Sequence, residues 1–486
     1  MNSKSKLALV VIVLLAGVVA GGNLLTEPEF KNEEGMKMQL ARSFADDGVI
    51  RARIAPGEYL DEVVLHNIST GWFYPVLLGS TFKIFGSSLV VARVFSLVTL
   101  LSFLVAVYFL AHALWGRKVA IFSVLLVASF APFYAHGKAV MPELLALLCL
   151  ILGVYFYLKH EHQDSARYAI LPGILIGLFV ATKPTFLLFF LPPLFVAHVV
   201  EALKWPDTRK WLVTFWISVT LMILPTLWLA VLHPIGTDSL RETLAQYSKP
   251  AEGPCVICTP DNIQTFVLHS SVFHVALLFV VGLAALLFDL WRNKFITSQL
   301  PLKITFAFFS LGTVWYYLGS TGNFRYLLPL QLILLFVLPA AMTSLPSHFR
   351  RFGSALCVVL ILVQGIHMFA FADTPIGDPY VQLEQFMQQH ISSGDSLGVI
   401  NAPIAVAIAP TRHVYQFIWN AENGIPEGVH ALSLPVSTLP NYLIFDPVRD
   451  VTESLDPYAD VLADNYKVVA DFEGRVVVMK KIGEGP

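Results

Sequence analysis

Five charged residues stand at the edges of apolar sequence, where ionised groups are costly unless they are paired or hydrated. Glu33 and Glu34 are adjacent in a polar stretch near the start of the chain, and Glu143 begins an apolar run. Lys183 and Arg325 lie in short turns between such runs. A carboxylate can take a proton from a hydroxyl group, and an arginine can bind two phosphate oxygens at once. These residue types suit acid–base chemistry on an anionic substrate.

The amino-acid composition predicts the class of protein to which these residues belong. Of 486 residues, 56% are apolar and only 14% are charged, and the mean hydropathy is +0.67. Soluble proteins are roughly 45–50% apolar and about 25% charged. The net charge of −2 leaves no basic surface for a nucleic acid, and four cysteines exclude a disulfide scaffold. The chain is therefore predicted to be a polytopic α-helical membrane protein.

Eleven apolar runs predict membrane spans, because a helix needs about 20 mainly apolar residues to cross the hydrocarbon. The first run has a charged start like that of a signal peptide, but its length and poor cleavage site favour an uncleaved span. The predicted spans are 7–25, 87–112, 119–135, 141–158, 169–182, 184–203, 211–232, 268–290, 304–320, 326–343 and 353–371.

The basic residues predict the orientation. With the N-terminus in the cytoplasm, most Lys and Arg residues between spans fall on the inside. The short outer turns then hold only Lys138, Lys183 and Arg325. An odd number of spans places the C-terminus outside. We therefore expect a multi-pass protein of a cell (inner or plasma) membrane, with a bacterial inner membrane favoured.

Two domains are expected, a membrane domain over 1–372, which includes the first outer loop 26–86, and an extracytoplasmic tail over 373–486. The tail is more polar and alternates between helix and strand patterns, which predicts a small α/β domain. Its predicted elements are a helix at 378–392, strands at 396–401 and 441–446, a weak helix at 455–465 and a hairpin at 467–481.

The first outer loop is predicted to contain two helices. In 32–47, Met36, Leu40 and Phe44 recur on one helical face. Glu33 and Glu34 favour a helix start, and Gly48 is a predicted stop. Residues 70–85 are almost wholly apolar and suit a helix that lies in the membrane interface.

Several segments resemble one family in the same order and on the same predicted face. Residues 33–42 (EEGMKMQLAR) are similar to the acidic motif in the first outer loop of the GT-C polyprenyl-phosphate-sugar glycosyltransferases. That group includes the dolichyl-phosphate-mannose–protein mannosyltransferases and the lipid A aminoarabinose transferases (family 39). Here Glu33 replaces the family's Asp, and Lys37 takes an often aromatic position. Further similar segments are 70–93, 136–148, 177–194 and 324–330.

This resemblance implies a GT-C fold and transfer of a sugar from a polyprenyl-phosphate donor to an acceptor hydroxyl at the extracytoplasmic face, with inversion. The acceptor could be a lipid, a glycan or a protein, and no nucleic acid is involved. The implied catalytic residues are Glu33, Glu34 and Glu143. The implied contacts to the donor phosphate or sugar are Lys183, Arg325, Tyr326, His66 and Lys138.

Other interpretations stay open for individual residues. Glu33 and Glu34 could simply form an acidic helix start, Glu143 could be a dipole partner, and Lys183 could extend to the interface. Arg93 is expected to be a structural ion-pair partner. A divalent cation is a further possibility, with Glu33, Glu143 and His136 as its ligands.

Two other functional classes are alternatives to glycosyl transfer. A transporter or flippase of lipid-linked saccharides should show inverted repeats and interrupted helices near the midplane, which the sequence lacks. A polymerase or ligase of lipid-linked saccharides would share the substrate class without needing the acidic motif. Cys255 and Cys258 could form a disulfide or remain free thiols.

Overall fold

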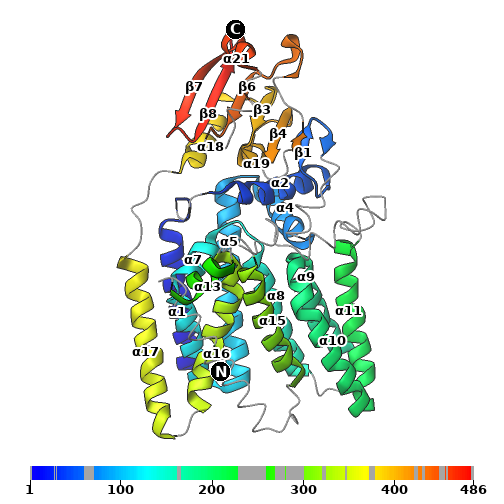
Figure 1. The fold of residues 1–486 in the computed structure, drawn as a ribbon, viewed down its shortest axis with the longest axis vertical. Helices are drawn as coiled ribbons and strands as arrows, with labels where there is room; N and C mark the ends of the chain where they lie inside the picture. Colours follow the sequence, from blue (N-terminus) through cyan, green and yellow to red (C-terminus); the bar gives the residue numbers. More distant parts are fainter. Residues whose placement is uncertain are drawn as a thin grey trace.

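The protein consists of a bundle of apolar helices with a β-sheet at one end (Figure 1). The N-terminus lies toward the opposite end of the bundle, and the C-terminus lies in the sheet region. The computed structural model describes residues 3–26, 28, 30–59, 71–160, 166–227, 259–268, 280, 300–319, 324–344, 347–370, 378–420, 425–428, 433–447, 455 and 458–482. His66, Cys255 and Cys258 lie outside these residues, as does the predicted span at 268–290 apart from Leu268 and Val280.

The bundle is built from helices that run roughly side by side in Figure 1. By length and composition, two helices of the described part could cross a membrane, Leu89–Trp115 and Arg325–Met342. A bent pair, α6 and α7, makes a third if it counts as one span. The helices are α1 (Ser3–Gly22), α5 (Leu89–Trp115), α6 (Arg117–Ala128), α7 (Ala131–Lys138), α8 (Glu143–His160), α9 (Ile170–Thr182), α10 (Leu187–Lys204), α11 (Arg209–Leu227), α13 (Thr259–Leu268), α15 (Leu300–Leu318), α16 (Leu328–Ser344) and α17 (Ser347–Ala370).

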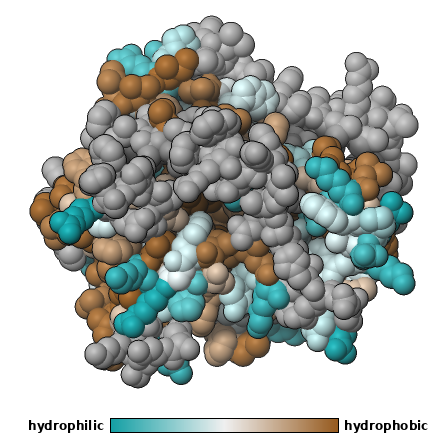
Figure 2. Space-filling view, turned by 90° about the horizontal axis from the view of Figure 1, so that it is seen from below, coloured by the Kyte–Doolittle hydropathy of each residue, from teal (hydrophilic) through white to brown (hydrophobic). Residues whose placement is uncertain are grey.

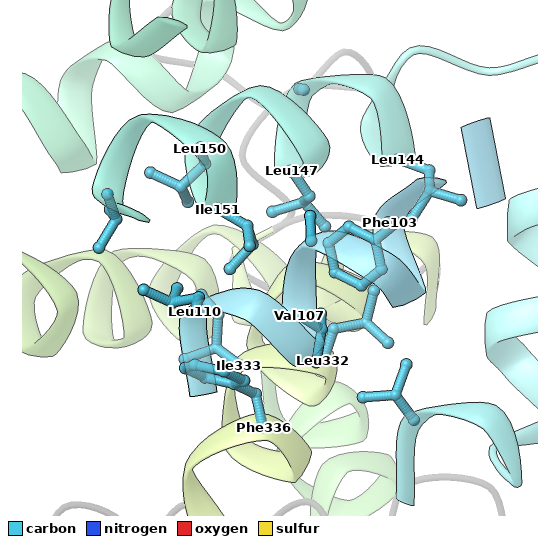
Figure 3. Packing of buried hydrophobic residues seen from close by; sticks show 14 of the residues in the cluster. Phe103, Val107, Leu110, Leu144, Leu147, Leu150, Ile151, Leu332, Ile333 and Phe336 are labelled. Carbon is cyan, nitrogen blue, oxygen red and sulfur yellow. The ribbon is translucent and has the colours of Figure 1, made fainter. Parts of the chain in front are cut away.

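The core of the bundle forms where α5, α8 and α16 meet (Figure 3). Apolar residues recur at three- and four-residue spacing, so each helix presents one continuous stripe to its neighbours. Phe103, Val107 and Leu110 of α5 face Leu147 of α8 and Phe336 of α16. All five are buried.

The span predicted over 119–135 is not one continuous helix. The sequence predicts a single helix over 119–135, but α6 ends at Ala128 and α7 begins at Ala131, with a bend of 66° between them. Pro132 lies in the first turn of α7. A proline there lacks the amide that would continue the preceding helix, and it favours a new helix start.

The bundle end that faces away from the sheet mixes hydrophilic and hydrophobic side chains (Figure 2). The junctions between α5 and α6, between α10 and α11 and between α16 and α17 lie at this end (Figure 1). These junctions carry basic residues such as Arg117, Lys204 and Arg209. The turns that carry Lys138, Lys183 and Arg325 lie at the other end, as the orientation argument predicts.

Helix α2 (Asn32–Asp47) crosses the sheet-side end of the bundle, and α4 (Phe73–Phe85) packs against it (Figure 1). Glu34 accepts a hydrogen bond from the Lys31 amide at 3.3 Å, which satisfies a free donor of the first turn. The helix ends at Gly48, whose φ of 72° lies in the left-handed region that glycine tolerates. A short hairpin that the sequence pattern does not predict follows, formed by β1 (Arg53–Ala55) and β2 (Glu58–Tyr59).

The tail contains a six-stranded sheet in the order β5-β4-β3-β6-β8-β7. Strand β3 pairs in parallel with β4 and β6, and the remaining pairs are antiparallel. The predicted strands, hairpin and first helix are present, while β4, β5 and α19 were not predicted. The elements are α18 (Pro379–His390), β3 (Leu397–Ile400), α19 (Pro403–Ile408), β4 (Val414–Asn420), β5 (Ile425–Gly428), β6 (Tyr442–Phe445), α21 (Ala459–Asn465), β7 (Tyr466–Phe472) and β8 (Val476–Lys481).

The sheet region is anchored to the bundle through α2 and α19. All six residues of α19 are buried, and a β-carbon on Gly35 of α2 would lie 2.5 Å from the Ile404 backbone nitrogen. Arg42 donates to the carbonyls of Val406 and Ala407 at 3.2 Å each. The backbones therefore approach so closely that α2 is held between the sheet region and the bundle.

Candidate active site

Three charged side chains from separate turns meet below the start of α2. Glu143 begins α8, Lys183 directly follows α9, and Arg325 lies in the 3₁₀ turn Phe324–Leu327 before α16. Lys183 Nζ lies 3.0 Å from Glu143 Oε1, and Arg325 Nε lies 3.6 Å from the same oxygen. The three side chains are only 6–13% exposed. Burial is tolerated because each charge has an opposite partner.

Glu33, from α2, is the fourth charged side chain of this ion-paired group. Its carboxylate forms an ion pair with Arg325, through Oε2 to Nη1 and through Oε1 to Nη2 at 3.5 Å. Unlike the other three, its side chain is 51% exposed. Partial burial favours the protonated form, but Arg325 outweighs it and holds the pKa of Glu33 below its ordinary value. Glu33 is therefore an ionised carboxylate that solvent can reach at neutral pH.

A small cavity lies beside these charges. Its charged part is formed by Glu143, Lys183 and Arg325, and its other walls are mainly aromatic and apolar. The ring of Tyr326 lies 5.5 Å from the Arg325 guanidinium carbon and 5.0 Å from the Tyr316 ring. The remaining lining residues are Thr185, Phe186, Phe189, Thr313 and Pro329. The cavity thus combines a cationic end with an apolar wall.

Glu34 points away from this cavity and into the protein. Its side chain is 1% exposed and lies 3.3 Å from Arg93, which is fully buried. The Val140 amide donates to Glu34 at 2.6 Å, and Arg93 donates to the carbonyls of Lys138 and Pro28 at 2.8 and 2.7 Å. Arg93 is thus the structural ion-pair partner that the sequence predicts. This network fixes α2 against the turn that leads to Glu143.

Lys37 lies one helical turn after Glu33 and is 8% exposed. Its charge interacts with Lys183 and Arg325 as well as with Glu33 and Glu143. Burial and the neighbouring Lys183 lower the pKa of Lys37 from 10.5 to about 7. Lys37 is not among the site residues that the sequence predicts. Residues four apart share a helix face, so its spacing from Glu33 was a usable signal.

The other candidate residues are distributed as follows. Tyr326 lines the cavity, whereas Lys138 is buried outside the lining, and its carbonyl accepts from Arg93. His136 lies within electrostatic range of Glu143 and Arg325. Among the described residues, no group of three or more His, Cys, Asp and Glu side chains could hold a metal ion.

Solved structures match all or nearly all of the chain. ArnT from Cupriavidus metallidurans, bound to undecaprenyl phosphate, superposes with a TM-score of 0.62 at 13% identity and 100% coverage of both chains. The chain has the GT-C fold. The GT-C oligosaccharyltransferase of Archaeoglobus fulgidus, in complex with zinc and sulfate, matches with a TM-score of 0.55 at 14% identity, covering 93% of this chain and 69% of that one.

A second structure from Archaeoglobus fulgidus, AglB with an inhibitory peptide and a dolichol-phosphate, matches with a TM-score of 0.53 at 13% identity. It covers 100% of this chain and 75% of that one. Within the GT-C chain described here, residues 70–233 match the dolichyl-phosphate-mannose-protein mannosyltransferase family. No curated protein sequence matches the chain. The family match includes Glu143 and Lys183 but not Glu33 or Arg325.

Proposed function

We propose that the chain is a membrane glycosyltransferase that moves a sugar from a polyprenyl-phosphate donor to an acceptor hydroxyl. The observation that carries this proposal is the ion-paired group of Glu33, Glu143, Lys183 and Arg325 at the rim of a partly apolar cavity. Such a site matches a substrate that is anionic at one end and hydrocarbon at the other. The ArnT match, bound to undecaprenyl phosphate, and the family match over 70–233 support the same substrate class.

Glu33 is the proposed general base. It is ionised, half exposed and next to the cations that would hold the donor phosphate. As the acceptor oxygen bonds to the sugar's anomeric carbon, its proton passes to Glu33. The bond from that carbon to the phosphate oxygen breaks, and its electron pair stays on the phosphate. Attack opposite the leaving group inverts the configuration of the anomeric carbon.

Arg325 and Lys183 are the proposed contacts of the donor phosphate. The phosphate gains negative charge as the sugar leaves, and fixed cations in a water-poor site stabilise that charge. Glu143 holds both cations in place through one carboxylate oxygen. Tyr326, on the cavity wall, is a proposed hydroxyl contact to the sugar or phosphate. Glu34 is then a positioning residue for α2, because its carboxylate is engaged by Arg93 and Val140.

The proposed setting is a cell membrane with the site at its extracytoplasmic face. The mixed hydrophilic end of the bundle would face the cytoplasm, and the sheet region would cover the site from outside. In this proposal the chain crosses the membrane eleven times. Residues 1–372 form the membrane domain, and residues 373–486 form the outer domain.

Sugar transfer by purified protein tests the proposed function. Radiolabelled polyprenyl-phosphate sugars are incubated in detergent with the protein and an envelope extract that supplies acceptors. We expect label to move to the acceptor fraction while free polyprenyl phosphate appears. Donor that crosses liposome membranes intact, with no release of polyprenyl phosphate, would instead identify a flippase.

A further inference from the structure

The guanidinium of Arg325 faces a carboxylate on each side. Its two terminal nitrogens pair with the two oxygens of Glu33, Nη1 with Oε2 and Nη2 with Oε1 at 3.5 Å. Its Nε lies 3.6 Å from Oε1 of Glu143. A guanidinium binds a phosphate as it binds a carboxylate, through two parallel N–H groups along one edge. A phosphate therefore gains a two-point contact with Arg325 only when one of the carboxylates leaves.

Glu143 is held too firmly to be the carboxylate that leaves. Its side chain is only 6% exposed, and its Oε1 lies 3.0 Å from Lys183 Nζ as well as close to Arg325. Withdrawing it from both cations would leave an uncompensated charge in the interior, which is strongly unfavourable.

Glu33 can leave at a much lower cost. Its side chain is 51% exposed, so water can hydrate the carboxylate once it is released. The backbone of α2 need not move, because Glu34 is fixed by Arg93 at 3.3 Å and by the Val140 amide at 2.6 Å. A change of side-chain rotamer is enough to take Glu33 away from Arg325.

Separation from Arg325 also changes the basicity of Glu33. Burial raises the pKa of this carboxyl, but the charge of Arg325 and its hydrogen bond outweigh burial and lower that pKa. Lys37 lowers the pKa further, and Glu143 raises it, each by less than Arg325 does. An anion bound to Arg325 in place of Glu33 would raise the pKa, since a neighbouring like charge disfavours the ionised form. A released Glu33 beside a bound phosphate is therefore the stronger base.

We propose that the donor phosphate displaces Glu33 from Arg325, so that donor binding releases the base for the acceptor hydroxyl. Glu33 then has two roles, first as the partner that the phosphate replaces and afterwards as the proton acceptor. An acceptor that arrives before the donor meets a carboxylate that is already paired, so the donor binds first in the productive order. The inference rests on the proposed function and adds this order to it.

Binding of undecaprenyl methyl phosphate to the full-length protein in detergent tests the exchange. This phosphodiester has the single negative charge of the proposed donor and no sugar to transfer, and tryptophan fluorescence gives its affinity. Glu33→Gln cannot form the ion pair, so we expect it to bind the probe about twofold to tenfold more tightly than wild type. Glu58→Gln, which changes an exposed carboxylate in the β1–β2 hairpin, should bind like wild type. Unchanged or weaker binding by Glu33→Gln would overturn the proposal.

The same substitution in an Arg325→Gln background separates competition from simple repulsion. If Glu33 competes with the phosphate for Arg325, the gain disappears in this background, and the double variant binds like Arg325→Gln alone. A gain of equal size in both backgrounds would show that Glu33 only repels the anion through space, which would also overturn the proposal. Thermal unfolding verifies that each variant is folded.

Carboxyl labelling tests the exchange in the wild-type protein. A water-soluble carbodiimide and an amine modify accessible carboxyl groups, and mass spectrometry of the digested protein gives the rate at each residue. We expect a saturating concentration of the probe to speed the labelling of Glu33 severalfold, because its ion pair is broken and its basicity rises. The rate at Glu58 should not change. Unchanged or slower labelling of Glu33 would contradict its release.

Failure of this inference is distinguishable from failure of the proposed function. Release of Glu33 by the probe, with no transfer of any sugar, would reject the transferase and keep the exchange. Sugar transfer by a protein whose Glu33→Gln variant shows no gain in affinity would keep the transferase and reject the exchange. Absence of probe binding by wild type would reject both.

Discussion

At the scale of single residues, Arg325 is central to the candidate site because it pairs with two carboxylates in different surroundings. Glu143 is buried with Lys183, whereas Glu33 is half exposed. The same guanidinium therefore keeps Glu33 ionised and stays close enough to the cavity to meet a phosphate. A carboxylate held ionised beside the proposed phosphate site is suited to the proposed role of general base, which takes a proton as the sugar departs.

The state of Lys37 predicts a proton uptake on binding. Its pKa is lowered to about 7 in the free protein, so part of the population is neutral at pH 7.5. A bound phosphate favours the ammonium form and raises that pKa. We expect undecaprenyl phosphate binding to take up protons near pH 7.5 and to weaken as the pH rises further. Calorimetry in two buffers of different ionisation enthalpy measures this uptake.

Lys37→Arg is the control for that measurement, because its guanidinium stays protonated at all these pH values. The uptake attributable to residue 37 should vanish in this variant. An identical uptake in Lys37→Arg and wild type would assign the proton to another group.

The buried pair of Glu34 and Arg93 should contribute strongly to stability. Removing one partner leaves an uncompensated charge in the interior, which costs about 3–5 kcal/mol. We expect Arg93→Met and Glu34→Gln each to lower the thermal unfolding temperature clearly, as measured in detergent. Arg412→Gln removes an exposed partner of Asp46 and Asp47 and should change stability by less than about 1 kcal/mol. Equal effects of all three variants would contradict this account.

At the scale of elements, α2 is the part that brings Glu33 to the ion-paired group beside the cavity. Its limits were predictable, because Glu33 and Glu34 mark its start and Gly48 its end. Its partner α19 was not predictable from local pattern, since a wholly apolar stretch of six residues indicates a buried strand as readily as a helix. The close approach of the two elements depends on Gly35.

Gly35→Ala is predicted to displace α2. The new β-carbon would lie 2.5 Å from the Ile404 backbone nitrogen, so the helix or α19 must shift. Overpacking of this kind costs about 1–3 kcal/mol. We expect reduced stability and reduced sugar transfer, measured by thermal unfolding and by the transfer assay. Gly394→Ala, where the nearest atom to a β-carbon is 3.9 Å away, is the matched control; an equal loss in both would rule out the contact as the cause.

At the scale of the whole molecule, the sequence predicted which turns share an end but not how they meet. The distribution of basic residues placed Lys183, Arg325 and the first loop on one face. The ion pairs that join Glu143, Lys183, Arg325 and Glu33 arise from the packing of α2, α8, α9 and α16, and no local spacing encodes such contacts. The sheet was only partly predictable for a similar reason. The parallel pairing of β3 with β4 joins segments that are separated in sequence, and local spacing does not encode such pairing.

The proposed orientation predicts the location of both ends of the chain. A reporter active only in the cytoplasm should function when fused before Met1 and not when fused after Pro486. A reporter active only outside should give the opposite pattern. A cytoplasmic signal from the C-terminal fusion would contradict the proposed eleven spans and the placement of the site at the outer face.

The most direct test of the central claim is sugar transfer by Glu33→Gln beside wild type and Glu473→Gln, which changes an exposed carboxylate in the sheet hairpin. The account predicts that Glu33→Gln lowers transfer by about 10²- to 10⁴-fold, retains undecaprenyl phosphate binding and unfolds at an unchanged temperature. Glu473→Gln should behave like wild type. Full transfer by Glu33→Gln would contradict the account, because the proposed base would then not take the proton.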